Sequence, residues 1–288
     1  MKNLFNKIYV LAFVLFFMAC ENLEVVVPID IEDPDPVLAV GAYFSNDMDS
    51  YNVSVSQAVG ALSDLENNNQ DSALIQIFEE GLLFDEFILN RFALEDFDQN
   101  FIPGNNYKLQ VSKSGFETIS AEAVYPSLVE IDTAYFRENN VVGEFNEEVK
   151  QVQINFQDPV GSNFYEIKAY IGYEFDSETY FYPLYPSNEQ FNGQRGRGEG
   201  LFFSDENFEG ELAEIIINYS DFEDAEDAEV ILELRHINEE YLLFDLSLEL
   251  AFNSNDNPFS EPVQVKSNIE NGFGVFALWN SDIVVLEN

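Results

Sequence analysis

The sequence predicts a mainly β protein: an N-terminal immunoglobulin-like β-sandwich, then a second β-rich domain with one helix in the C-terminal half. Two observations support this fold class. Short runs of β-forming residues, bounded by turn residues, recur at regular spacing on both sides of Pro126. Apolar residues recur at helical spacing at one place, after Asn238.

Residues 1–19 have the layout of a bacterial lipoprotein signal peptide. Lys2 and Lys7 precede an unbroken apolar run over residues 8–18, and Ala19 precedes Cys20, the only cysteine of the chain. The apolar run is shorter than the ~20 residues that a membrane-spanning helix needs. We therefore expect cleavage before Cys20 and lipid modification of its thiol.

Residues 20–36 read as an acidic, proline-rich tether that leads into the first strand. Two interpretations of the acidic residues directly after Cys20 remain open. They resemble the surface-export signal of Bacteroidota lipoproteins, and they equally fit an ordinary acidic tether.

Residues 37–126 are predicted to form the sandwich. Strands are expected at 37–45 and 51–61, and at 73–89 as two strands around a Glu80-Gly81 turn. Further strands flank turns at Pro103-Gly104 and Gly115.

Residues 127–288 form the second predicted domain, with strands within 149–175, 210–220 and 228–237. A helix is expected near 239–252, with Asn238 as N-cap and acidic residues in its first turn. The C-terminal tail is expected to return to strands around a Gly272/Gly274 turn.

The chain is strongly acidic, with 12 Lys and Arg, 54 Asp and Glu, and a formal charge of −42. Loss of residues 1–19 removes Lys2 and Lys7 and brings the charge to −44. This charge argues against nucleic acid and against an anionic membrane surface as partners. A hydrophobic content of 46% with 28 Phe argues against disorder.

Catalytic motifs are missing from the sequence: it has no G-x-S-x-G, no H-E-x-x-H and no phosphate-binding glycine loop. The single histidine, His236, could be a general base or a ligand, but a structural role at a strand end is favoured. Paired carboxylates could still hydrolyse glycosides. The acidic run 221–229 could hold Ca²⁺, although a solvated turn is favoured, and we expect no cofactor.

Four residues are candidate partner contacts. Arg195 and Arg197 stand together in a loop of a chain that is poor in basic residues, and pairing with the protein's own acidic surface is the alternative. Phe273 and Trp279 could stack on a sugar ring, or they could fill the domain core.

The C-terminal stretches 257–262 and 267–276 resemble the closing signature of a Bacteroidota outer-membrane lipoprotein family, that of domain of unknown function 4249. Weaker matching pieces are Cys20, residues 103–109, Tyr125-Pro126, Asp158-Pro159 with 163–165, 203–210 and Glu240-Tyr241. Phe17-Met18 departs from the leucine that is usual before the cysteine.

The resemblance implies an outer-membrane lipoprotein with two β-rich domains that often accompanies TonB-dependent transporters. It implies no catalytic residues. We expect a non-enzymatic, lipid-anchored accessory or binding protein, facing the cell surface, with an outer-membrane β-barrel as partner. The alternatives are a glycan-binding surface lipoprotein and a glycoside hydrolase that uses paired carboxylates.

Overall fold

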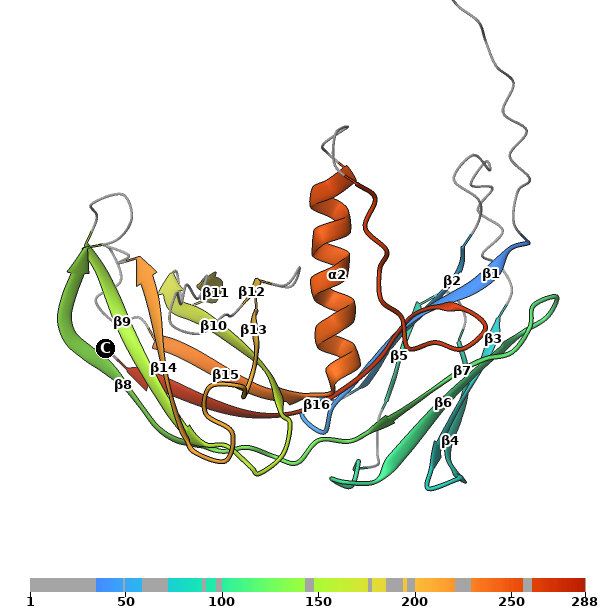
Figure 1. The fold of residues 1–288 in the computed structure, drawn as a ribbon, viewed down its shortest axis with the longest axis horizontal. Coiled ribbons are helices and arrows are strands. Elements are labelled where there is room, and N and C mark those ends of the chain that lie inside the picture. The colour runs from blue at the N-terminus through green and yellow to red at the C-terminus, as the bar shows by residue number, and fades with distance from the viewer. Residues whose placement is uncertain are drawn as a thin grey trace, which may run out of the picture. The chain divides into compact units, whose positions relative to one another are not determined.

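The computed structural model describes residues 35–48, 50–58, 72–89, 92–96, 100–142, 148–175, 178–184, 194–195, 200–220, 229–255 and 261–287. These residues belong to one compact unit, Asp35–Asn288. The unit is mainly β, with one helix in the C-terminal half of its described part (Figure 1). No helix in the described ranges is long and apolar enough to cross a membrane.

The described strands form three sheets. A four-stranded sheet has the order β4-β3-β6-β7, and a three-stranded sheet has the order β14-β9-β8. A nine-stranded sheet has the order β12-β13-β10-β15-β16-β1-β2-β5, with β11 paired to β10. The strands are β1 Val37–Phe44, β2 Ser50–Ala58, β3 Ala73–Glu79, β4 Leu82–Leu89, β5 Phe92–Asp96, β6 Asn106–Lys113, β7 Ile119–Val124, β8 Ile131–Val142, β9 Glu148–Gln157, β10 Phe164–Phe175, β11 Glu178–Leu184, β12 Gln194–Arg195, β13 Leu201–Ser204, β14 Leu212–Ser220, β15 Glu229–Ile237 and β16 Phe273–Glu287.

The first core lies between the four-stranded sheet and strands β1 and β2. Side chains alternate between buried and half-buried along β1 and β6, as expected for strands that turn one face to a core. The β3–β4 hairpin turns at Glu80 and Gly81, which have φ values of 47° and 81°. Positive φ at both central residues of a two-residue turn fits a hairpin, so the turn predicted at this place is confirmed.

The second core lies between β14-β9-β8 and the face of β10 and β15 that carries Tyr165 and Leu234. In Figure 1 these strands curl into a half-barrel. The two strands expected around 158–161 are present as β9 and β10, and those expected at 210–220 and 228–237 are present as β14 and β15.

Strand β16 joins the two halves of the chain. It pairs in parallel with β1 and antiparallel with β15, and its Phe276 and Leu278 pack into the first core. The division into domains 37–126 and 127–288 stays a prediction. Its test is whether residues 37–126 fold without β16. The tail becomes a strand only from Phe273 onward, since 261–269 has no regular structure.

Helix α2 (Glu239–Asn255) begins where the sequence predicts, after Asn238. Asn238 occupies the expected N-cap position, where its carbonyl accepts the Tyr241 and Leu242 N–H groups, but its side chain bonds to other partners. Its Oδ1 accepts the Leu278 N–H at 2.9 Å, and its Nδ2 donates to the Glu240 carboxylate at 2.8 Å. The residue therefore fixes the start of the helix to β16, which a sequence pattern does not reveal.

Candidate binding pocket

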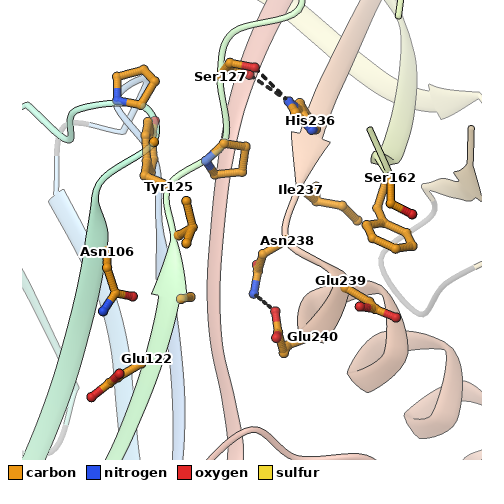
Figure 2. A pocket seen from close by; sticks show the side chains of 16 residues that line it. Asn106, Glu122, Tyr125, Ser127, Ser162, His236, Ile237, Asn238, Glu239 and Glu240 are labelled. Atoms are coloured by element: carbon orange, nitrogen blue, oxygen red, sulfur yellow. Dashed lines mark hydrogen bonds between the residues drawn. The ribbon is translucent and has the colours of Figure 1, made fainter. Parts of the chain in front are cut away.

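A pocket of about 610 Å³ lies where β7 ends and where β15 passes into α2 (Figure 2). This size is within the range of small-molecule sites. Its wall combines apolar surface with amide, hydroxyl, imidazole and carboxylate groups from distant parts of the chain. It is lined by Pro103, Gly104, Asn106, Glu122, Ala123, Val124, Tyr125, Pro126, Ser127, Ser162, Phe164, His236, Ile237, Asn238, Glu239 and Glu240.

Tyr125 and Pro126 form one wall, and hydrogen bonds to three other segments hold them in place. The Tyr125 N–H donates to the Asn105 carbonyl at 3.0 Å, and its hydroxyl accepts the Asn46 N–H at 3.0 Å. The Pro126 carbonyl accepts the amide of Asn280 at 3.4 Å. Burial raises the pKa of Tyr125 to about 12, so its hydroxyl stays protonated at neutral pH.

His236 lies in the pocket wall with its Nδ1 atom 2.8 Å from the Ser127 carbonyl oxygen (Figure 2). Its ring stacks on Tyr165, with 5.3 Å between the centroids. Burial lowers the pKa of His236, and the hydrogen bond to Ser127 and two buried aspartates oppose that effect. The imidazole is therefore neutral at pH 7.

The pairing of Ser127 with His236 is not that of a nucleophile and its base. A carbonyl oxygen accepts only, so Nδ1 must carry the proton that it shares with the Ser127 carbonyl. The Ser127 hydroxyl is 3.4 Å from the same Nδ1, which has no lone pair left to receive the hydroxyl proton. This geometry favours the structural role for His236 that the sequence indicated.

The charge of the pocket wall is negative. Glu122, Glu239 and Glu240 line it, and neither lysine nor arginine is among its lining residues. Lys108 lies 3.0 Å from the Glu122 carboxylate and lowers the pKa of that group. Glu239 and Glu240 stand in the first turn of α2, where the helix dipole favours negative charge. The pocket suits neutral polar or cationic groups.

A buried charged cluster lies under α2, on the face of the large sheet opposite the second core. Register places Glu166 beside Arg235 and Lys168 beside Glu233 on β10 and β15. Arg235 donates to Glu166 at 3.2 Å and to Glu233 at 2.5 Å. The Tyr241 hydroxyl of α2 donates to Glu166 at 3.3 Å. The cluster thus attaches the first turns of the helix to the sheet.

The structure places the predicted partner contacts in different surroundings. Phe273 is 56% exposed at the start of β16. Trp279 is 5% exposed and lies under the Arg235 guanidinium, 4.7 Å from the ring centroid, so its surroundings favour the core role. Arg195 belongs to β12, and its side chain lies outside the described residues, as do Arg197 and Cys20.

The acidic run 221–229, the candidate Ca²⁺ segment, also lies outside the described residues except for Glu229. Within the described ranges, no group of three or more His, Cys, Asp or Glu side chains could hold a metal ion.

Sequence reasoning missed both the pocket and the charged cluster. The pocket is assembled by residues more than 100 positions apart, which no local pattern connects. The cluster did leave a signal, because Lys168 and Arg235 stand with Glu166 and Glu233 in strands that are rich in apolar residues. In an acidic protein, basic residues within core strands indicate buried partners.

The fold and the pocket together define a mainly β protein with an acidic pocket of mixed apolar and polar lining and no recognised catalytic constellation in its described part. The chain belongs to the family of the domain of unknown function DUF4249, whose model matches residues 24–282. No curated protein matches the chain.

Proposed function

We propose that this protein is a lipid-anchored accessory or binding lipoprotein of the outer membrane, facing the cell exterior. It acts together with an outer-membrane β-barrel, such as a TonB-dependent transporter. The observation that carries the proposal is the signal layout of residues 1–20, with the only cysteine at the expected cleavage site. Diacyl or triacyl modification would supply the two chains that stable anchoring needs.

The pocket supports a binding role over a catalytic one. Its single imidazole is neutral, and its Nδ1 proton is engaged by a backbone carbonyl. The wall offers hydrogen-bonding groups on a framework of strand ends, as a binding site does.

The net charge provides a mechanism for partner choice. A protein with a net charge near −44 attracts a basic or cation-bridged surface, and this attraction weakens as salt screens the charges. Arg195, Arg197 and the segment 257–279 are the proposed contact regions.

Purification from native membranes in mild detergent tests the proposal. We expect the protein to co-purify with a β-barrel protein at low ionic strength and less of it at high ionic strength. Recovery of the protein alone under both conditions, together with hydrolysis of a glycan, would reject the accessory role and support a glycoside hydrolase.

Anchoring has its own test. The Cys20→Ala variant should leave the membrane fraction or remain unprocessed, because the acylated thiol is the proposed anchor. Cys20→Ser, a second variant that keeps the size of the side chain but lacks the thiol, should behave in the same way. A variant that still sediments with membranes after a carbonate wash would contradict the anchor.

Glycan binding is the second candidate function, and the pocket favours it. Asn106 and Ser162 offer groups that hydrogen-bond hydroxyls, and Phe164 offers an aromatic surface. Glycan-array screening of the wild type and of Asn106→Ala tests it. A glycan signal that the substitution leaves unchanged would place the binding elsewhere.

We also propose that residues 37–126 form an immunoglobulin-like sandwich. One core shared by the four-stranded sheet and by β1 and β2 supports this. An experimental structure with a different strand topology would correct it.

A further inference from the structure

The four-stranded sheet ends in two edge strands that differ in protection. At one edge, β7 exchanges two backbone hydrogen bonds with Glu270, from the Ser120 N–H at 3.3 Å and to the Ser120 carbonyl at 2.7 Å. At the other edge, β4 pairs with β3 alone among the described strands. An edge strand presents a row of backbone donors and acceptors to any strand that approaches it.

Strand β4 carries one device that protects such an edge, a register shift opposite Ile77 and Phe78, and residues 86–89 beyond that shift pair regularly. The hairpin 73–89 contains four acidic residues, no lysine, no arginine and no proline. Its apolar side chains are strongly exposed: Leu82 is 76% exposed, Leu83 55% and Ile88 58%. Glu86 is exposed on the same outer face as Ile88, two residues away along the strand.

We propose that the free edge of β4 binds an extended, basic segment of a partner protein by adding it as a strand to the sheet. Backbone hydrogen bonds would supply the affinity. Apolar side chains of the segment would cover Leu83 and Ile88, and basic ones would face Glu86.

Charge selects this occupant over the others. In a second copy, Glu86 would face another acidic strand, and two chains that each carry a net charge of −42 would repel each other. An anionic lipid surface would meet the same repulsion. A segment whose outward face carries basic and apolar residues in turn, at every second position, matches both the carboxylate and the aliphatic side chains on the outer face of β4.

The test uses the purified protein and a fluorescent nine-residue peptide in which threonine occupies every second position and valine and lysine take turns at the others. The same peptide with glutamate in place of lysine is the negative probe. We expect the lysine peptide to bind, to bind more weakly at 0.5 M than at 0.05 M salt, and to slow amide exchange within residues 82–89. Neither the membrane anchor nor a β-barrel is needed, so the outcome is independent of the proposed function.

Two variants sharpen the assay. Glu86→Lys should weaken binding of the lysine peptide at least tenfold, because it places a lysine on the edge strand and reverses the local charge. Glu117→Lys is the matched control: it makes the same charge change in the exposed β6–β7 turn and should weaken binding less than twofold. Circular dichroism establishes that both variants fold.

Three results would overturn the proposal. They are equal losses in the two variants, exchange protection that falls outside β4, and equal binding of the glutamate peptide. A fourth would be self-association through β4 that excludes the peptide, because it would assign the edge to a second copy.

Discussion

Replacing Arg235 with leucine removes the cation at the centre of the buried cluster under α2. The Arg235 side chain is 14% exposed and neutralises Glu166, which is fully buried. Burial alone would lower the pKa of Arg235, but Glu166 and Glu233 outweigh it and raise that pKa above its ordinary range. The guanidinium is therefore charged at every pH at which the protein folds.

The expected loss of unfolding free energy follows from the contacts that disappear. Removing one partner of a buried ion pair costs about 3–5 kcal/mol, and Arg235→Leu is expected in this range because Glu233 loses its guanidinium and Glu166 keeps only Lys168, 3.5 Å away. The stacking of Arg235 on Trp279 adds about 0.5–2 kcal/mol. A domain is stable by only about 5–15 kcal/mol, so Arg235→Leu should lose about a quarter or more of the total.

Urea unfolding followed by far-ultraviolet circular dichroism measures this loss. The matched control is Arg235→Leu combined with Glu233→Gln, which leaves Glu166 paired with Lys168 and removes the carboxylate that lost its partner. This double variant should recover more than half of the lost stability. A loss below about 1 kcal/mol in the single variant would refute the reasoning, since it would show that water reaches these carboxylates.

Three further predictions concern other parts of the fold. Burial lowers the pKa of His236 in the folded protein, so the stabilising effect of its neutral imidazole is complete above pH 6.5, the ordinary pKa in the unfolded chain, and is lost as the pH falls below it. The melting temperature should therefore fall more between pH 7.5 and pH 5.5 for the wild type than for His236→Asn. Gly274→Ala should lower the free energy of unfolding by more than about 3 kcal/mol, because its Cβ would lie 1.8 Å from the Val40 carbonyl oxygen at a φ of +117°. Gly104→Ala, which has open space around it, should lower it by about 1 kcal/mol in the same urea assay. A fragment of residues 37–126 lacks β16 beside β1, and we expect it to unfold cooperatively only when the segment 261–288 is added; cooperative unfolding of the fragment alone would instead support an independent first domain.

The sequence predicts a strand well where one face of that strand is buried and the other is exposed to solvent. Strand β4 and the Glu80-Gly81 turn are found within a residue of their expected positions, because alternation and turn chemistry are local signals. The parallel pairing of β1 with β16 is not predictable in this way. It joins residues more than 230 positions apart, and its only sequence trace is Gly274.

The candidate site shows the same division. His236 stands out in the sequence because it is the single histidine, and its strand-end position is found as expected. Its partner, the Ser127 carbonyl, is a backbone atom that has no side-chain signature. The burial of Trp279 likewise depends on where α2 lies, which the sequence of that helix does not specify because its apolar and polar residues are not separated into two clear faces.

Strand β15 connects the pocket with the helix that borders it. Successive side chains of a strand point to opposite faces, so Arg235 and His236 act on different neighbours although they are adjacent in the chain. Arg235 attaches α2 through Glu166 and Tyr241, and His236 attaches the segment after β7 through Ser127. The two walls of the pocket are thus fixed by consecutive residues of one strand. A change at either residue should alter the width of the pocket, because each holds one wall in place.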